Sequence, residues 1–481
     1  MPGEPRGRPS RSQDRPSRAR AGPRPVRTDP VRRAAFDVLR AVTDRDAYAN
    51  LLLPPVLRER HFTGRDAAFA TELTYGTLRG QGTYDAVLAT CSDRPLDRIA
   101  PPILDVLRMG THQLLATRVG AHAAVNTSVD LARQTGGSGA AGFVNAVLRR
   151  VASQGLEDWV AQTAPDRGSD PVGHLSVRYS HPRWVVAAFS EALGEDVTSG
   201  YPETERLLAA DSTPPGVTLC AAPGSTVLAR PGAEGIVAAQ WSPFGLYLEG
   251  GDPASLPAVR HGDARVQDEA SQLAVVALTR VQAGTPDRRW LDMCAGPGGK
   301  AHLLAWLAAG SGARLLAADV RTHRAQLVRA AVASTGAAGA VVGDGTAPVW
   351  RPGSFDRVLA DVPCSGLGAL RRRPEARWRK SPADIAALGG LQRRLLANAI
   401  DAARPGGVVA YVTCSPHVSE TREVVGDVTG ARRDVTVLDA PDVLREVPGL
   451  RCPGPDGRYA QFWPHRHGTD AVFIALIRRD S

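Results

Sequence analysis

The stretch LDMCAGPGGKAHLL, residues 291–304, decides the fold. An apolar run that enters a glycine-rich turn and continues with helical spacing predicts a buried strand, a tight turn and a helix. Gly296, Gly298 and Gly299 allow a backbone to approach a bound ligand where a Cβ would block it. Asp319 ends the next predicted strand and can accept hydrogen bonds from a ribose diol. The stretch therefore predicts a nucleotide-containing cofactor at the end of a strand.

Apolar runs alternate with helical stretches on both sides of this motif, from about residue 266 to the C-terminus. This alternation predicts an α/β, Rossmann-like domain with a mostly parallel sheet flanked by helices. One long helix is expected to begin with Ser381 as N-cap, Pro382 in the first helical position and Asp384 closing the first turn. Its end is expected at Pro405-Gly406-Gly407, directly before the next strand.

The part of the chain that precedes this domain divides into three segments. Residues 31–155 carry apolar residues at spacings of three and four, which predicts an all-α domain. Residues 156–265 mix helical and β-like runs with Gly/Pro punctuation, so we expect a small α+β connector. Residues 1–30 are rich in Arg and Pro and nearly lack bulky apolar residues, so we expect a disordered tail.

Composition limits the class of protein. A chain of 481 residues with 43% apolar residues is long enough for several cores. It contains no apolar run of the roughly 18 to 20 residues that a membrane span needs and no secretory signal, so we expect a cytoplasmic protein without a membrane partner. The six cysteines form no CxxC pair, so neither a disulfide framework nor a metal site is expected.

The net charge of +9 comes mostly from the tail, because residues 1–33 hold ten arginines and three acidic residues. A tail of this kind can contact phosphates, or it can simply keep the protein soluble. Only Lys300 and Lys380 are lysines among 58 basic residues. A lysine in such a chain indicates that a compact ammonium group is wanted at that position.

Two further motifs follow the predicted fourth and fifth strands of the sheet. DRVLADVPCSGLGALRRRPEARW, residues 356–378, places Asp361 and Cys364 just past a strand, and VVAYVTCSPHVSE, residues 408–420, ends a strand with Cys414. In a doubly wound sheet these strands are neighbours, so the two thiols and the carboxylate would meet at one edge. The segment RRRPEARW suits phosphate contacts and base stacking, and it is equally compatible with a solvated charged loop.

These groups suit methyl transfer to C5 of a pyrimidine. C5 is a poor nucleophile, but a thiolate that adds to C6 turns the ring into an enamine whose C5 can attack a sulfonium methyl group. The thiol needs an electropositive neighbourhood to ionise, and a carboxyl such as Asp361 can hydrogen-bond to the N3 edge of the base. Gly296-x-Gly298-x-x-Ala301, with an acid about twenty residues later, also satisfies the dinucleotide fingerprint, so an NAD-dependent oxidoreductase stays open.

The motifs CAGPGGK, ADVPCSG with RRRPEARW, and YVTCS together resemble the Sun/Fmu (RsmB) family of ribosomal RNA small-subunit cytosine-C5 methyltransferases. AFATELTYGTLR, AAVNTSVDLAR and GFVNAVLRR look like the NusB-type RNA-binding domain of that family, and YSHPRW and VQDEASQL look like its connector motifs. The resemblance implies a class I fold, S-adenosylmethionine as cofactor, and a cytosine of 16S ribosomal RNA, naked or in an early particle, as substrate. A monomer is expected, because an enzyme that works on a large RNA needs no second subunit.

Carried over by position, the resemblance implies a catalytic set of Cys414, Cys364, Asp361 and Lys300. Cys414 would attack C6, Cys364 would assist product release, and Asp361 would orient the cytosine. Asp319 would bind the ribose of the cofactor, and Asp344 would lie near its adenine. The remaining cofactor contacts would be Cys294, Ala295, Gly296, Pro297, Gly298, Gly299, Lys300 and Asp361.

The sequence departs from the family at several positions and leaves other readings open. The usual CAAPGGKT has Gly296 and Ala301 here, and the usual Glu-Asn pair reads Glu420-Thr421. DNA cytosine methyltransferases use a Pro-Cys nucleophile, and by that analogy Cys364 would attack instead of Cys414. An RNA-binding or antitermination factor with an inactive enzyme domain is a further alternative. His302 and His417 lie near the motifs and could be catalytic or structural.

Overall fold

Strand β5 (Arg289–Asp292) carries the start of the glycine-rich motif and lies inside a sheet, as predicted. The protein is described from a computed structural model that covers Gly3 and residues 29–229, 232, 235–284, 286–454 and 456–480. The expected disorder of the tail concerns residues that, apart from Gly3 and 29–30, lie outside this part.

The sheet of the C-terminal half has the strand order β10-β12-β9-β8-β5-β6-β7, with β11 paired to β12. The five strands from β9 to β7 run parallel, and β12 and β10 are antiparallel additions at one edge. The chain leaves β5 toward β6 and β7, then crosses to β8 on the other side, so the switch point of the topology lies between β5 and β8. The strands are β6 (Arg314–Asp319), β7 (Ala338–Val342), β8 (Phe355–Asp361), β9 (Ala403–Thr413), β10 (Val435–Leu438), β11 (Ala460–Gln461) and β12 (Phe473–Arg479).

Helices cover both faces of this sheet, because alternate strand residues pack in opposite directions. In β9, Val408, Ala410 and Val412 join the core under the helices that precede β5, β6 and β7, whereas Val409 and Tyr411 join the core on the opposite face. The helices of the first face are α13 (Glu269–Arg280), α14 (Gly299–Ser311) and α15 (Thr322–Val332); those of the second are α16 (Pro382–Ala402) and α17 (Arg422–Gly430). The short helices α18 (Ala440–Val443) and α19 (Pro464–His467) complete this half.

Helix α16 begins as the sequence predicts. Ser381 accepts from the backbone of Asp384, and the Asp384 carboxylate accepts from the Ser381 N–H in return, with Pro382 in the first helical position. The predicted end is wrong by three residues: the helix stops at Ala402, and β9 already includes Pro405-Gly406-Gly407. Ladder pairing resumes after an irregularity between Phe355 and Arg357, so the Pro-Gly-Gly residues form a bulge inside the strand.

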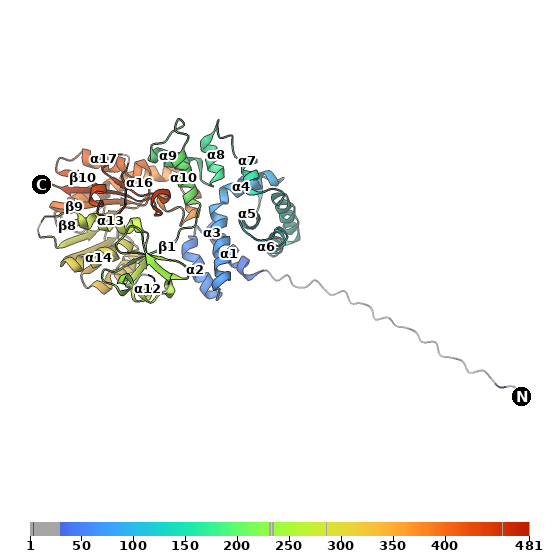
Figure 1. Ribbon diagram of the computed structural model, residues 1–481, viewed down its shortest axis with the longest axis horizontal. Coiled ribbons are helices and arrows are strands. Elements are labelled where there is room, and N and C mark those ends of the chain that lie inside the picture. The colour runs from blue at the N-terminus through green and yellow to red at the C-terminus, as the bar shows by residue number, and fades with distance from the viewer. Residues whose placement is uncertain are drawn as a thin grey trace.

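The N-terminal half is helical, as the apolar spacing predicts (Figure 1). Its core is one apolar cluster that includes the fully buried Leu73, Leu107, Leu131 and Leu148. Trp159 of the following helix belongs to the same cluster and donates its indole N–H to Val151 O. The helices are α1 (Pro30–Arg45), α2 (Ala49–Glu59), α3 (Gly64–Arg79), α4 (Gln81–Cys91), α5 (Pro101–Ala116), α6 (Ala121–Val151, interrupted at Gly137) and α7 (Leu156–Thr163).

Two different pieces connect the halves. Helices α8 (Pro171–Arg178), α9 (Arg183–Leu193) and α10 (Pro202–Asp211) share an apolar cluster with Leu367, Leu370 and Trp463 of the C-terminal half. A four-stranded antiparallel sheet of order β2-β3-β1-β4 has its own small core. Its elements are β1 (Val217–Ala221), α11 (Thr226–Ala229), β2 (Ile236–Ala238), β3 (Gly245–Leu248), α12 (Pro257–His261) and β4 (Ala264–Val266).

Candidate active site

The two thiols meet at the carboxyl edge of the large sheet, as predicted. Asp361 is the last residue of β8, Cys364 follows it, and Cys414 follows the neighbouring strand β9. The Sγ atoms of Cys364 and Cys414 lie 3.3 Å apart, close enough for one thiol to donate a hydrogen bond to the other. The loops are tied together nearby, where Gly368 N donates to Cys414 O at 2.9 Å.

Lys300 reaches the same place from the first turn of α14. Its Nζ lies 2.8 Å from Asp361 Oδ2, and the Lys300 side chain is only 11% exposed. Burial disfavours the ammonium ion, but the charge and hydrogen bond of Asp361 outweigh it, so the pKa of Lys300 is raised above its ordinary value. The sequence-predicted set of Cys414, Cys364, Asp361 and Lys300 is thus brought together in space.

The environment shifts the pKa values of the two thiols in opposite directions. The hydrogen bond from Cys364 lowers the pKa of Cys414; burial and Asp361 oppose this shift, and the charges of Lys300 and Arg373 support it. The hydrogen bond to Cys414 and burial both raise the pKa of Cys364. Cys414 is therefore the thiol that ionises more easily, as a nucleophile must, while Cys364 keeps its proton.

The glycine-rich turn runs from β5 into α14. Ala295 N donates to Ala318 O at 2.8 Å, and Gly296 N donates to Asp319 Oδ2 at 3.1 Å, so the turn is fastened to the end of β6. A Cβ on Gly296 would lie 2.3 Å from that Asp319 oxygen. Gly298 has a φ of +107°, and a Cβ there would lie 2.7 Å from Ala331. Gly298 is therefore required by the protein's own backbone and packing, and a side chain in place of Gly296 would displace the Asp319 carboxylate. The sequence prediction of close ligand approach did not include these contacts.

The other predicted cofactor residues surround this turn. Asp319 is buried, and its second oxygen accepts from Arg321 N at 2.8 Å. Asp344 is exposed just beyond β7, and its carboxylate accepts from the N–H and hydroxyl of Thr346, which lowers its pKa. Pro297 is exposed and Cys294 is half-buried, and burial raises the pKa of the Cys294 thiol.

Two buried polar side chains at the turn were missed by the sequence analysis. Asp292, the last residue of β5, is fully buried, and among the described residues neither carboxylate oxygen has a hydrogen-bond partner. Burial, assisted by the charge of Asp361, raises the pKa of Asp292 to about 8. Gln267, directly after β4, also leaves both polar atoms of its buried amide unpaired, 3.8 Å from the Cβ position of Gly299. Unpaired buried polar groups beside a glycine turn fit a polar cofactor that would pair them.

Glu420 holds the two thiol loops together, a role that the altered Glu420-Thr421 pair of the sequence did not predict. It is fully buried, and its Oε1 accepts from Ser365 N at 2.7 Å and from Gln392 Nε2 at 3.1 Å. Its Oε2 accepts from the Ser365 hydroxyl, which lies 3.1 Å from the Ser415 hydroxyl. Ser365 follows Cys364 and Ser415 follows Cys414, so Glu420 holds both thiol loops in place through the residues next to the cysteines.

Both readings of RRRPEARW, phosphate contacts and a solvated charged loop, leave out what Arg371, Arg372 and Arg377 do in the structure, which is to pair with groups of the protein itself. Arg371 and Arg372 each form ion pairs with Asp268 and Asp470. Arg377 is fully buried and donates to four carbonyls, those of Arg79, Tyr179, Ser180 and Asp211. A guanidinium group with five donors can join several chain segments, so this arginine-rich motif fastens the catalytic loop to the rest of the protein.

The two histidines near the motifs have structural partners. His302 is buried, and its Nε2 lies 3.0 Å from Gly262 O, which links α14 to the small sheet. His417 Nδ1 accepts from Ser419 N at 3.2 Å and caps a short helical turn. Neither histidine has a hydrogen bond to the thiols or to Lys300 among the described contacts.

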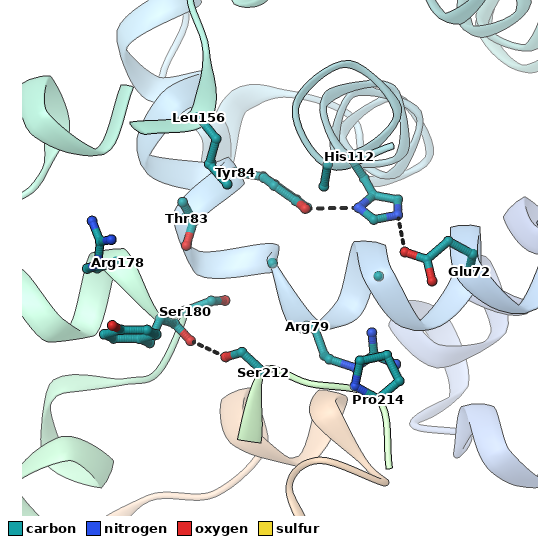
Figure 2. A pocket seen from close by; sticks show the side chains of 14 residues that line it. Glu72, Arg79, Thr83, Tyr84, His112, Leu156, Arg178, Ser180, Ser212 and Pro214 are labelled. Atoms are coloured by element: carbon teal, nitrogen blue, oxygen red, sulfur yellow. Dashed lines mark hydrogen bonds and ion pairs between the residues drawn. The ribbon is translucent and has the colours of Figure 1, made fainter. Parts of the chain in front are cut away.

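A cavity of about 260 Å³ lies elsewhere, between the helical half and the connector (Figure 2). Its wall includes a chain of contacts in which Tyr84 Oη lies 2.9 Å from His112 Nδ1 and His112 Nε2 lies 3.3 Å from Glu72 Oε1. None of its lining residues follows β5, β8 or β9, so the cavity is separate from the thiols.

Neither a metal-binding cluster nor a membrane-spanning helix occurs in the described part of the chain. No group of three or more His, Cys, Asp or Glu residues there could hold a metal ion. No described helix is long and apolar enough to cross a membrane.

Known proteins match both halves of the chain. The 16S rRNA methyltransferase RsmB/F family matches residues 280–478, and the NusB family matches residues 29–153. The chain is 51% identical to a Mycobacterium tuberculosis protein named only as a methyltransferase, over 94% of this chain and 97% of that protein. It is 32% identical to the ribosomal RNA small subunit methyltransferase B of Pseudomonas putida, over 93% of this chain and 98% of that protein.

Solved structures agree in fold. The crystal structure of PH0851 matches with a TM-score of 0.75 at 21% identity, over 93% of this chain and 98% of that one. NSun6 from Pyrococcus horikoshii, solved with SFG, an analogue of S-adenosylmethionine, matches with a TM-score of 0.50 at 16% identity, over 62% of this chain and 98% of that one. The methyl donor of the catalytic domain is S-adenosylmethionine, and the turn 294–300 with Asp319, Asp292 and Gln267 offers the groups that would hold it. The chain belongs to the RsmB/F family of 16S rRNA methyltransferases and carries a NusB-family domain in front of its catalytic domain.

Proposed function

We propose that the chain methylates C5 of a cytosine in 16S ribosomal RNA through a covalent bond between Cys414 Sγ and C6 of the base. The observation that carries the proposal is the pair of thiols 3.3 Å apart at neighbouring strand ends, beside the Lys300–Asp361 ion pair. A methyltransferase that acts on a nitrogen or an oxygen atom needs no such pair. The family and the name of the P. putida relative support ribosomal RNA as the substrate.

The chemistry of cytosine explains the need for a thiolate. Addition of the Cys414 sulfur to C6 moves an electron pair toward C5, which then attacks an electrophilic methyl group. The bound cofactor supplies that methyl group. Lys300 stabilises the Cys414 thiolate and holds the Asp361 carboxylate, which orients the cytosine by accepting a hydrogen bond from the 4-amino group beside N3.

The adduct must be resolved after methylation. A base takes the C5 proton, the electron pair of the C5–H bond re-forms the C5–C6 double bond, and the C6–S bond breaks with its electron pair returning to Cys414 as the thiolate. Cys364 lies 3.3 Å from the departing sulfur and keeps its proton, so we assign it to assist release. All four groups come from one chain, so the proposal needs no second subunit.

The chain is divided into domains in a way that fits an enzyme whose RNA substrate is bound by one domain and methylated by another. We propose a helical RNA-binding domain over 31–155, a connector over 156–265 and the methyltransferase domain over 266–481. The NusB-family match over 29–153 supports the first unit. The match also favours a second candidate function, RNA binding without catalysis.

The test is methyl transfer from labelled S-adenosylmethionine to unmodified small-subunit ribosomal RNA, naked and in particles, with 5-methylcytosine as the product to be mapped. Cys414→Ala should abolish transfer, and Cys364→Ala should accumulate a covalent protein–RNA adduct. Adduct accumulation in Cys414→Ala instead would make Cys364 the nucleophile. RNA binding without transfer by the wild type would favour the non-catalytic function.

A further inference from the structure

Among the arginines of the segment 371–379, only Arg373 has a guanidinium group without a hydrogen bond or ion pair to another described residue. Arg371 and Arg372 pair with Asp268 and Asp470, and Arg377 donates to four carbonyls. Arg379 donates to the carbonyls of Val42, Asp46 and Ala47 in the helical domain. Arg373 is exposed, and no hydrogen bond or ion pair joins its guanidinium to any other described residue.

The side chain of Arg373 is nevertheless held in place. Its guanidinium carbon lies 5.4 Å from the ring centroid of Tyr48, the residue that precedes α2 of the helical domain. Tyr48 as a whole residue is 37% exposed. A guanidinium over an aromatic face keeps its N–H edges free for a planar acceptor such as a phosphate or carboxylate. The site therefore presents an ordered donor with unused hydrogen bonds.

A second cation shares the same ring. The guanidinium carbon of Arg379 lies 5.2 Å from the Tyr48 centroid, so two positive charges face one aromatic side chain. Like charges at such range repel, and an anion bound beside them would offset that repulsion. The carboxylates in reach are weak partners: Asp46 lies 3.9 Å from Arg379 and is largely exposed, and Glu375 is buried and accepts from Ala49 N.

Arg373 lies close enough to the two thiols that an anion bound to it would be part of the substrate. The segment continues directly from the loop of Cys364, and that loop is hydrogen-bonded to Cys414 through Gly368. The positive charge of Arg373 helps to lower the pKa of the Cys414 thiol. Figure 1 shows α2 on the side of the helical domain that faces the catalytic half. A ligand on Arg373 would therefore lie at the seam of the two domains, within electrostatic range of the nucleophile.

We propose that Arg373 and Tyr48 form a composite phosphate-binding site that holds the backbone of the substrate RNA beside the target cytosine. The inference rests on the proposed function, because it takes RNA to be the substrate. Each domain supplies one half of the site: the helical domain contributes the ring and the catalytic loop contributes the guanidinium. The site thus exists only when the two domains are docked.

The test compares Arg373→Gln, Tyr48→Leu and Tyr48→Phe for affinity to unmodified small-subunit ribosomal RNA at several salt concentrations. Arg373→Gln should weaken binding by about tenfold, since it removes a charge-assisted contact. The slope of log affinity against log salt should fall by about one phosphate contact. Tyr48→Leu should lose much of the same affinity, and Tyr48→Phe should retain it because the ring face remains.

The matched control is Arg445→Gln. Arg445 is also an exposed arginine, but it lies in the catalytic domain, outside the proposed RNA-binding domain, and pairs only with the exposed Asp442 among the described contacts. Equal weakening by Arg445→Gln, or unchanged RNA affinity in Arg373→Gln, would overturn the site. Melting temperatures of the variants exclude unfolding as the cause. A wild type that transfers methyl groups normally while Arg373→Gln binds RNA as tightly would reject this inference and leave the proposed function intact.

Discussion

At the scale of the single residue, Asp292 is an ionisable group for which burial outweighs the groups, such as Lys300, that favour its negative charge. Its buried oxygens have no described partner, and burial raises its pKa to about 8. The folded state therefore keeps the proton up to about pH 8, whereas the unfolded chain releases it near pH 4. Stability contributed by the proton is present at low pH and is lost as the pH rises through this window.

Asp292→Asn should remove that pH dependence, because an amide of similar shape cannot ionise. The melting temperature of the variant relative to wild type should rise steadily from pH 5 to pH 8 and level off above. Thermal unfolding of both proteins across this range measures the difference. A difference that does not change with pH would mean that Asp292 does not hold its proton in the folded state.

Lys300 sets the acidity of the nucleophile in the same small region. The charge of Lys300 lowers the pKa of Cys414. Without Lys300, the Asp361 carboxylate would be unpaired, and its negative charge would raise the pKa of Cys414. Lys300→Met should shift the acidic limb of the pH–rate profile to higher pH. Lys380→Met is the matched control, since it removes the only other lysine and should leave the limb in place. An unshifted limb in Lys300→Met would separate this lysine from the activation of Cys414.

At the scale of the element, the sequence predicted what depends on local spacing and strand order. The capped start of α16 and the meeting of Cys364 with Cys414 followed from residues close in sequence and from the rule that parallel strands end at one edge. The end of α16 was misplaced, because a Pro-Gly-Gly run can form a strand bulge as well as a helix stop. Glu420 was missed, because its partners Ser365 and Gln392 are 55 and 28 residues away.

Glu420→Gln tests whether the short turn Val418–Glu420 holds the two thiol loops. The new amide would place an N–H group among donors from Ser365 and Gln392, so at least one buried donor would lose its acceptor, at a cost of about 1–3 kcal/mol. We expect a lower melting temperature and slower methyl transfer, with adduct formation impaired as well as release. Glu423→Gln makes the same chemical change at an exposed position and should be silent. Normal adduct formation in Glu420→Gln would show that the loops do not need this contact.

At the scale of the whole molecule, RRRPEARW shows the limit of sequence reasoning most clearly. An arginine-rich segment beside an active site indicates nucleic-acid contacts when only composition is visible. In the folded chain Arg377 meets carbonyls of Arg79, Tyr179, Ser180 and Asp211, which come from three places earlier in the chain. No local pattern reports such partners, so the motif that joins the domains could not be distinguished from one that binds RNA.

Arg377 therefore decides whether the helical and catalytic domains unfold together. Arg377→Ala should leave several buried carbonyls without a donor and destabilise the protein by at least about 3 kcal/mol. The lost stability should concern the contact between the helical and catalytic domains. We therefore expect denaturant unfolding of the variant in two steps, where the wild type unfolds in one. Intrinsic fluorescence and far-ultraviolet circular dichroism, recorded on the same samples, would reveal the separation.

Arg393→Ala is the control, because it removes an exposed pair with Asp427 that should contribute less than about 1 kcal/mol. If Arg377→Ala still unfolds in one step with both probes, the domains are coupled through the remaining contacts between them, which join Arg379 to Val42, Asp46 and Ala47 and Glu375 to Ala49. If it unfolds in two steps, the composite site of Tyr48 and Arg373 should lose RNA affinity before the catalytic domain unfolds. That order follows because the site needs both domains, whereas the thiol pair needs only the strands β8 and β9.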